Sequence, residues 1–495
     1  MHGISRRTLL AGGALGGLGV GVSPYLRDYT MALAYETPRV RFEATSPEGK
    51  EMLNSYAAGV ADMKARPESD PLSWTFQWYT HWVGANTSKE AEIDRVFGAA
   101  DSPAKMLALA MWDTCRGHIT WSNEQDWFSP WHRMYLLFFE EILRITSGNP
   151  DFTLPYWDYT SVGRRALPEE FRMQGDATFG SLFVAARNPG VNDGTPLDQS
   201  PLYPQLQQGI GRDPLGLDCL DIIEYRNVGF AQGFNASLDT APHGMVHVLV
   251  GDGTNMGSVP FAASDPIFWI HHSNVDRIWA SWTAAADGRE PPSDAAWNDM
   301  MFTFADGSGA ETLAKTSDFL TTDALGYSYQ DLLVAPGSAI RLASAGARSG
   351  AEVATDMAEG KEVALGTEPA RVQLDLPQQA DARLRSTGAG AERLYLVLRN
   401  LQTNVQPGVL YSVYLGGADD DGLFVGAINF FDALPAGREA PAEGGRFFSF
   451  DVTDAMDGLR QNGTLPETPE VSIAPTGAPA SEAQPVVGEV FFALQ

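Results

Sequence analysis

Apolar residues recur at helical spacing in three separate segments of the chain. Residues 131–144 contain no Gly or Pro, and their apolar side chains cover a broad face, which predicts a largely buried helix. Residues 266–282 show the same pattern, and Asp265 just before them is a typical helix cap. A shorter apolar segment at 243–250 predicts a further helix. The stretch 176–218 is rich in Gly, Pro, Asn and Asp and predicts long loops instead.

The pattern changes in the last third of the chain. Short apolar runs separated by Gly, Asn and Pro turns predict the strands of a small β-sandwich. These runs lie at 394–398, 409–415, 423–430 and 447–452. Before them the composition shifts toward Ala, Gly, Ser and Glu, which indicates a linker. We therefore expect a mainly α domain at 35–335, a linker at 336–383 and a C-terminal β-sandwich at 384–495.

Composition and charge narrow the class of protein. With 44% hydrophobic and 19% charged residues, the 495-residue chain is typical of folded, aromatic-rich proteins. Its formal net charge of −28 argues against binding nucleic acid or anionic lipid through its own field. The two cysteines, Cys115 and Cys219, exclude a disulfide scaffold and leave one bridge possible. The sequence does not indicate the oligomeric state.

The N-terminus has the pattern of an export signal. Residues 5–10 read SRRTLL and precede an apolar, Gly-rich segment at 11–22, which is typical of a twin-arginine signal. That segment is short for a membrane span. Cleavage after Ala34 would remove it, whereas an uncleaved signal would act as an anchor. We expect a leader at 1–34 and a periplasmic or extracellular mature protein, with no membrane contact after export.

The histidines predict a metal site. His243 and His247 stand four residues apart, so both rings lie on one helical face and can hold one metal ion. A zinc protease would carry Glu after the first of them, and here the residue is Gly244. In the adjacent pair His271 and His272 the side chains diverge by about 100° on a helix, so one of the two is expected to complete the site. Upstream, apart from His2 in the expected leader, lie three further histidines, which are His81, His118 and His132.

Two long motifs resemble the copper signatures of the tyrosinase and catechol oxidase family. They are FSPWHRMYLLFFE at 128–140 and DPIFWIHHSNVDRIW at 265–279, and the shorter PYWD at 155–158 and YSY at 327–329 also match. The resemblance covers roughly 71–330. It implies a bundle of four helices with long loops around two copper ions, with O2 as co-substrate and a small phenol as substrate.

The resemblance also implies which histidines hold each copper. By motif position, His81, His118 and His132 hold the first, and His243, His247 and His272 the second, with His271 as a packed neighbour. The first set departs from the usual pattern, in which the second ligand stands nine residues before the histidine of Trp-His-Arg. Here that position is Asn123, and an insertion would place His118 there instead. Many family members link this histidine to a cysteine by a thioether, and Cys115 is either such a partner or a buried free thiol.

Residues near the second site bear on the choice of substrate. In the family an acidic residue there holds a water that helps to deprotonate a monophenol, often with an Asn after the first ligand. Asp239 matches the acid or is a helix cap, while Gly244 lacks the amide. Val259 matches the residue that gates the site or is ordinary packing. Asn274 and Asp276 are either partners of the His272 ring or surface residues paired with Arg277.

The resemblance therefore favours an oxidase that converts o-diphenols to o-quinones with weaker or absent monophenol hydroxylation. Two alternatives stay open: a full tyrosinase, and a reversible O2 carrier like molluscan haemocyanin, which has the same copper pair. The single copper domain, the export signal and the absence of repeats favour the enzyme. A third hypothesis is a latent enzyme, in which the C-terminal domain shields the active site and blocks its activity.

Overall fold

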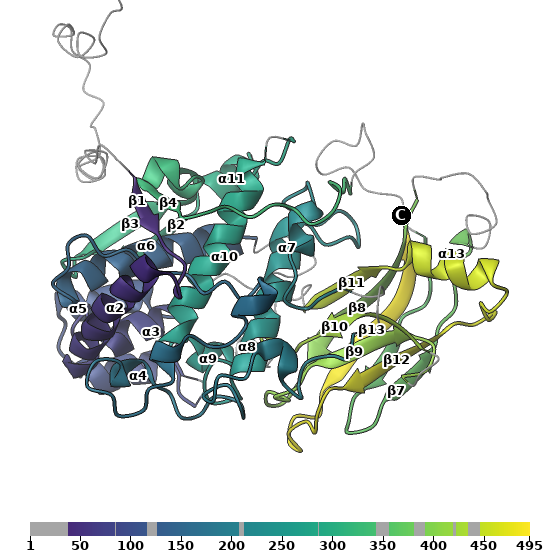
Figure 1. The fold of residues 1–495 in the computed structure, drawn as a ribbon, viewed down its shortest axis with the longest axis horizontal. Helices are drawn as coiled ribbons and strands as arrows, with labels where there is room; N and C mark the ends of the chain where they lie inside the picture. Colours follow the sequence, from purple (N-terminus) through teal and green to yellow (C-terminus); the bar gives the residue numbers. More distant parts are fainter. Residues whose placement is uncertain are drawn as a thin grey trace, which may run out of the picture.

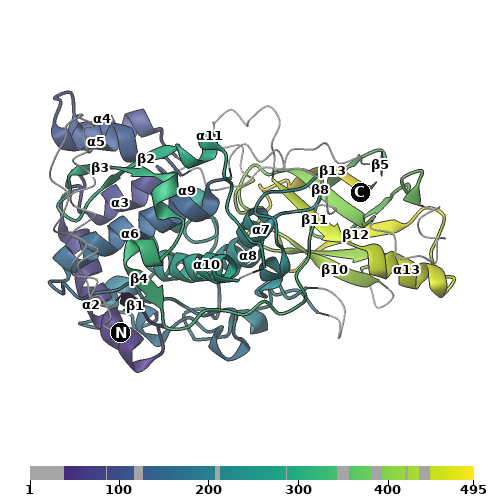
Figure 2. The same ribbon diagram turned by 90° about the horizontal axis from the view of Figure 1, so that it is seen from above.

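The computed structural model describes residues 38–84, 86–115, 126–206, 212–285, 287–342, 356–380, 392–418, 422–433 and 446–495. Helices and long loops make up its N-terminal part, and two antiparallel sheets make up its C-terminal part, beside the helices α7 and α8 (Figures 1 and 2). This confirms the predicted mainly α region followed by a β region. The leader and His118 lie outside the described residues. Within these residues no helix has the length and apolar character needed to cross a membrane.

Four helices form the centre of the N-terminal part. The helices α6 (Phe128–Thr146) and α10 (Ile267–Ala284) pack together through the stacked rings of Phe139 and Trp269, whose centroids lie 3.4 Å apart. The other two are α3 (Trp74–His81) and α8 (Gly244–Val250). The peripheral helices are α2 (Pro47–Ala65), α4 (Lys89–Phe97), α5 (Pro103–Met111), α7 (Phe234–Leu238), α9 (Val259–Ala262) and α11 (Ala295–Asn298).

The predicted central helices form for the reasons that their sequences give. Nearly every residue of α6 from Phe128 to Leu143 is buried, as expected for a segment with a broad apolar face. Before α10, the Asp265 carboxylate accepts a hydrogen bond from the Ile267 N–H at 3.0 Å and is also bound by Arg187. Between these helices, the described residues of the predicted loop segment 176–218 run as loops with short helical turns, as their Gly and Pro content predicts.

A buried ionic network joins α6 and α10 to the first and the last strand of the N-terminal part. Asp276 on α10 binds Arg133 of α6 at 2.6 Å and Arg41 at 3.2 Å. The latter lies in β1 (Arg39–Arg41), which pairs in parallel with β4 (Tyr327–Tyr329). Both tyrosines of β4 donate their hydroxyls to the same carboxylate. A further hairpin, β2 (Met301–Ala305) with β3 (Glu311–Lys315), packs beside α5 and α6.

The C-terminal part consists of two sheets. Their strand orders are β10-β9-β12-β7 and β11-β8-β13-β5, with β6 also paired to β13. The bounds are β5 (Asp356–Met357), β6 (Lys361–Ala364), β7 (Ala370–Gln373), β8 (Leu394–Gln402), β9 (Tyr411–Leu415), β10 (Leu423–Ile428), β11 (Phe447–Asp451), β12 (Glu470–Pro475) and β13 (Val486–Leu494), with the helix α13 (Thr453–Gln461) after β11. The four predicted runs coincide with β8 to β11.

Part of the segment that the sequence indicates as a linker lies in these sheets. The strands β5, β6 and β7 fall within 336–383 and pair with β13 and β12 near the end of the chain. Their partners were not predicted because Val486–Leu494 and Glu470–Pro475 become recognisable as strands only through pairing over a long sequence distance.

Apolar contacts join the two parts of the chain. Phe230 and Ala231 from the loop region share a buried cluster with Val397 of β8 and Phe491 of β13. The rings of Phe230 and Phe491 meet edge to face at 5.2 Å. The sheets are therefore packed against the helical part, and this contact brings side chains of the C-terminal part to the histidines described below.

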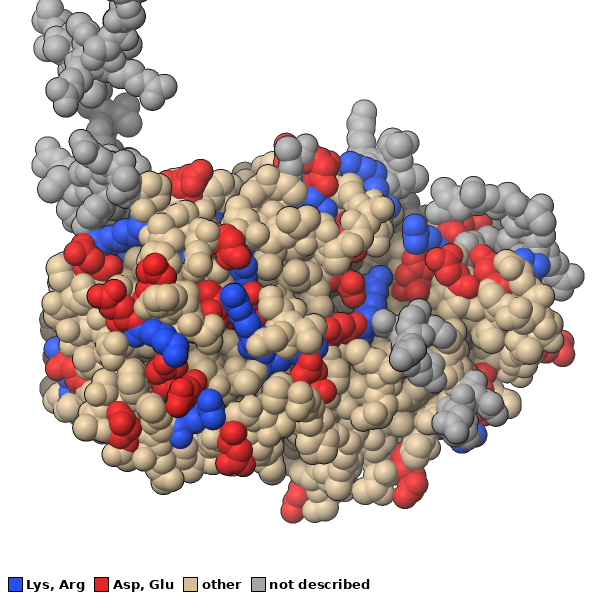
Figure 3. Space-filling view, viewed as in Figure 1, with Lys and Arg blue, Asp and Glu red and all other residues tan. Residues whose placement is uncertain are grey.

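In Figure 3 acidic and basic side chains are interspersed over both parts of the face that is drawn.

Candidate metal centre

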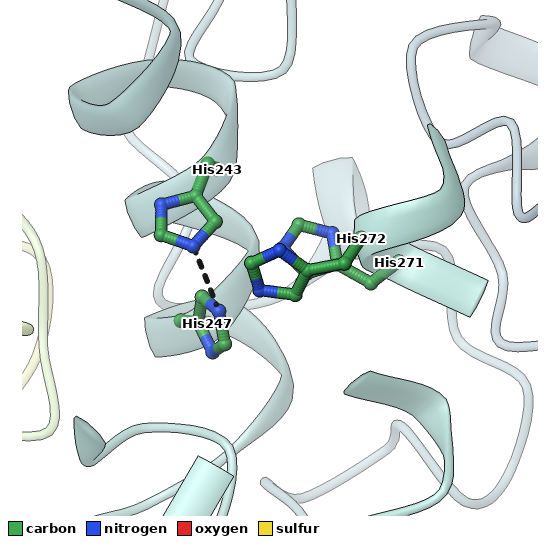
Figure 4. Close-up of side chains that lie close together, drawn as sticks. All are labelled: His243, His247, His271 and His272. Carbon is green, nitrogen blue, oxygen red and sulfur yellow. Dashed lines mark hydrogen bonds between the residues drawn. The ribbon is translucent and has the colours of Figure 1, made fainter. Parts of the chain in front are cut away.

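Four histidines from two helices converge in the interior. His243 and His247 stand one helical turn apart at the start of α8, and His271 and His272 lie on the facing side of α10 (Figure 4). Every one of these side chains is fully buried. One ring nitrogen from each lies within 4.8 Å of the others, a spacing that can hold a metal ion.

The backbone orients two of these rings for metal binding. The Nδ1 of His247 lies 2.7 Å from the Met256 carbonyl, and that of His243 lies 3.0 Å from the Asp239 carbonyl. A carbonyl only accepts, so both rings carry their proton on Nδ1 and turn the Nε2 lone pair toward the centre of the site. The two Nε2 atoms lie 3.1 Å apart. Two lone pairs facing each other at this distance fit a shared metal ion.

Both members of the adjacent pair reach the cluster. The ring of His271 stacks parallel to that of His243 at 5.4 Å, and the ring of His272 stacks on His132 at 4.3 Å. Within the described part of the chain, neither His271 nor His272 has a hydrogen-bond partner for either ring nitrogen. Burial, together with the neighbouring imidazoles, lowers the pKa of both rings well below the ordinary value, so they stay neutral, as metal ligands must be.

A second group of ligand atoms lies beside the first. His81 at the end of α3, His132 on α6 and the thiol of Cys115 bring their ligand atoms within 4.8 Å of one another, and all three are buried. The Nδ1 of His132 lies 2.8 Å from the Phe128 carbonyl, which repeats the orientation seen in the other group. The predicted third ligand, His118, lies outside the described residues. Cys115 and Cys219 are both free, so the bridge between them is not formed.

Two phenylalanines pack between the histidines. The ring of Phe128 lies 4.8 Å from His132 and 4.7 Å from His243, and the ring of Phe268 lies 4.1 Å from His272 and 5.0 Å from His81. Each precedes a histidine of its own helix by four residues, a spacing that places them on one face. Their positions in the two motifs were thus a usable signal that sequence reasoning did not draw on. The two phenylalanine rings fill the space between the two groups of histidines, and they leave little room there for water.

Of the three residues predicted near the second copper, Asp239 and Gly244 adjoin His243. The Asp239 carboxylate is fully buried, with Oδ1 3.1 Å from the Nδ1 of His243. Asp239 stands at the C-cap of α7, whereas the cap residue before α8 is His243. Gly244 begins α8, and a Cβ added there would come within 2.8 Å of the Asn429 amide. Val259 begins α9 and is buried.

The C-terminal part supplies two side chains to the site that no sequence motif predicts there. The Phe431 ring stacks on His247 with centroids 3.9 Å apart and an interplanar angle of 14°, so it covers this histidine. Arg446 is buried beside it and contacts Asp239 and Asp432. Burial disfavours its charge, yet the two carboxylates hold the pKa of Arg446 above its ordinary value. Neither residue belongs to a motif, so only the packing of the two parts reveals them.

The remaining predicted partners have structural roles. Asp276 binds Arg41 and Arg133, as described above, and it is buried, not a surface residue. The Asn274 side chain accepts a hydrogen bond from Arg277 at 3.2 Å, as the alternative pairing expects, but both residues are buried and do not form a surface pair.

Comparisons with known proteins agree with this geometry. The family model described as the common central domain of tyrosinase matches residues 71–208 and 221–285. A second model, a domain of unknown function (DUF7868), matches 351–492. A tyrosinase of Hahella sp. (strain CCB-MM4) is 30% identical over 89% of this chain and 96% of its own length. A chloroplastic polyphenol oxidase of Vicia faba is 30% identical over 59% of this chain and 48% of its own length.

Solved structures share the fold of the whole described chain. The structure of latent apple tyrosinase aligns with a TM-score of 0.60 at 22% identity, over 92% of this chain and 97% of that chain. A functional unit of octopus haemocyanin aligns with a TM-score of 0.51 at 14% identity, over 92% and 99% of the two chains. Both likenesses include the C-terminal sheets as well as the helical part.

Proposed function

Because this chain belongs to the tyrosinase and polyphenol oxidase family of type 3 copper proteins, we propose that it oxidises o-diphenols to o-quinones with O2 and hydroxylates monophenols weakly or not at all. The coarser statement follows from the family: the protein is a copper-dependent phenol oxidase, which uses a phenolic substrate and O2. The finer choice between the two activities rests on residues at the edge of the second site.

The histidines fit the dinuclear copper site of the family. We assign His81, His118 and His132 to one copper and His243, His247 and His272 to the other. When bound, two copper ions supply the reduction of O2 coupled to oxidation of the phenol. The protein contributes neutral imidazoles of fixed orientation, and the packed rings of Phe128 and Phe268 exclude water from the space between them.

The observation that carries the diphenol preference is Gly244 beside Asp239. A monophenol must lose its hydroxyl proton before it is hydroxylated, and a base with an ordered water assists that loss. One oxygen of Asp239 lies against the His243 ring, and the other lies 3.3 Å from Arg446. Gly244 has no side chain to hold a water beside this carboxylate. A catechol needs less help, because its oxidation does not add oxygen to the ring.

We also propose that the full chain is a latent form of the enzyme. The fully buried Phe431 ring lies flat on His247 and edge-on to His243 at 5.8 Å, where a planar phenol would have to approach the second copper. The solved latent apple tyrosinase shares the fold over nearly the whole chain, sheets included. The C-terminal part would then have to be displaced or removed before turnover.

The N-terminal motif supports a proposal on location. Arg6 and Arg7 followed by a short apolar segment support export by the twin-arginine route, which carries folded proteins. Replacing both arginines by lysine should retain the protein in the cytoplasm. Unchanged export of that variant in cell fractionation would contradict this route.

One experiment tests the proposed function. Copper content is measured for the purified, copper-loaded protein, and initial rates are then measured on catechol and phenol with the full chain and with Phe431→Ala. We expect two coppers per chain, faster turnover of catechol in the variant, and little or no phenol hydroxylation. Phenol consumed as fast as catechol without a lag would identify a full tyrosinase. Reversible O2 binding without turnover in either protein would identify a carrier.

A further inference from the structure

A single buried arginine joins the C-terminal sheets to the second histidine group. Arg446, just before β11, places Nη1 2.7 Å from Oδ2 of Asp432 and 3.3 Å from Oδ2 of Asp239. Asp432 belongs to the C-terminal part, whereas Asp239 belongs to the helical part and contacts His243 through its other oxygen. Arg446 is 4% exposed, and Asp239 is completely buried. One guanidinium thus bridges carboxylates from the two parts of the chain.

The same arginine organises the segment that carries Phe431. Its Nη2 donates to Oδ1 of Asn429 at 3.3 Å and to the Asp239 carbonyl at 3.4 Å. The amide of Asn429 donates to the Thr240 carbonyl at 3.1 Å, and its Oδ1 also accepts from the Phe431 N–H at 3.2 Å. Arg446 therefore binds a residue on each side of Phe431, Asn429 before it and Asp432 after it.

We propose that Arg446 is a positioning residue that clasps the segment 429–432 onto the site and keeps the Asp239 carboxylate engaged while Phe431 covers His247. This proposal rests on the proposed function and concerns the regulation of the same site. Displacement of the C-terminal part uncovers His247 and releases Oδ2 of Asp239 in one movement, because both contacts belong to the same segment. The clasp and the covering ring therefore act as one device.

The clasp stabilises the docked state because the two buried carboxylates need the guanidinium of Arg446. A carboxylate that is buried without a cation or hydrogen-bond donors is strongly disfavoured. Without the guanidinium, Asp239 and Asp432 lie in the same buried pocket with their charges repelling each other. The favoured response is separation of the two parts, which lets the carboxylates reach water. A purely structural ion pair inside the sheets would not have this effect on the site.

The test combines variants of Arg446 with a readout that is independent of turnover. Cys219 belongs to the helical part, is 1% exposed, and lines the cleft against Phe448 and Phe450 of the sheets. Its alkylation by iodoacetamide, followed by peptide mass spectrometry on the copper-loaded full chain, reports separation of the two parts. Catechol oxidation is measured on the same samples, and far-UV circular dichroism verifies folding.

Four variants separate the clasp from general damage. Arg446→Gln removes the cation, Arg446→Lys keeps the charge but not the fork of donors, and Arg446→Gln with Asp432→Asn removes the cation without adding net negative charge. Arg371→Gln is the control, because Arg371 pairs with Glu470 between β7 and β12, within the sheets. If Arg446→Gln alone fails to fold, the double variant still tests the clasp, because it removes one of the two carboxylates together with the cation.

We expect the glutamine and double variants to label Cys219 at least tenfold faster than the unchanged chain and to approach the catechol activity of Phe431→Ala. The lysine variant should lie between, and the control should match the unchanged chain. A folded double variant with unchanged labelling and activity would overturn the clasp, as would an equal effect of Arg371→Gln. If neither the unchanged chain nor Phe431→Ala oxidises catechol, the proposed function fails, while the labelling rates still decide the role of Arg446.

Discussion

Replacing Phe431 by alanine should release the activity of the full chain. The ring is completely buried and stacks on His247 at 3.9 Å. Truncating a buried Phe to Ala removes about 3–5 kcal/mol of packing free energy, of which an aromatic pair accounts for about 0.5–1.5 kcal/mol. If the closed state, in which Phe431 covers His247, loses only the free energy of this ring contact, the population of the open state rises several-fold. If all of the lost packing counts, it rises roughly 10²- to 4 × 10³-fold, because about 1.4 kcal/mol corresponds to a factor of ten.

The assay is the initial rate of quinone formation from catechol by copper-loaded full chain, with copper content measured on each sample. We expect at least a tenfold rise in kcat/KM for Phe431→Ala, since even a closed chain without this ring leaves room above His247. The matched control is Phe424→Ala in β10, because Phe424 is equally buried but meets Tyr414 edge to face inside the sheets. That variant should lose stability without gaining activity.

Two results would refute this reasoning. If Phe431→Ala binds two coppers and still turns over catechol at the rate of the unchanged chain, the ring is not what limits access. If Phe424→Ala activates the chain to the same extent, loosening of the sheets in general, and not the ring on His247, controls activity.

Three further predictions follow from the geometry. Copper analysis should show that His272→Ala loses about one copper per chain while His271→Ala keeps two; the opposite result would exchange the ligand and its neighbour. Gly244→Asn should raise the catechol rate of the full chain, because the new Cβ would meet the Asn429 amide at 2.8 Å and push the C-terminal part away; an unchanged rate in a folded protein would contradict this. Although burial opposes its charge, Asp276 has its pKa held below the ordinary value by two buried arginines, so its stabilising contribution is present at neutral pH and is lost as pH falls through that lowered pKa. Asp276→Asn should cost about 3–5 kcal/mol of unfolding free energy, and denaturant titrations at pH 7 that show no loss would count against this ion network.

The helical part and the histidines that converge in it could be predicted largely from local sequence. The helices α6 and α10 are almost wholly buried, so their apolar residues form broad, readable faces. The spacing of His243 and His247 on one helix is a local property as well. Adjacent histidines on a helix diverge, which led to the expectation that only one of His271 and His272 faces the site. The structure brings both within reach, because the cluster is approached from two sides, by α8 and by α6.

The C-terminal part could be predicted less well for a physical reason. Strands are stabilised by partners that are distant in sequence, so β5 to β7 resemble a linker until β12 and β13 are placed beside them. The same limitation hides Asn429, Phe431 and Arg446. Each is an ordinary residue in a turn or at a strand end, and its role arises only from the docking of two parts far apart in sequence.

The close approach of Asn429 to Gly244 connects a residue noted from local sequence with one that is revealed only by the docking of the two parts. From sequence, Gly244 indicated only the lack of an amide beside Asp239, and so a weak monophenol activity. In the structure the space that a side chain at 244 would need holds the Asn429 amide and the Arg446 guanidinium. A larger residue at 244 cannot coexist with the docked sheets without a shift of one or the other. In the proposed function Gly244 disfavours hydroxylation of monophenols, and in the proposed clasp the same residue leaves the space that Asn429 and Arg446 occupy. We therefore propose that substrate preference and latency are coupled through this single position.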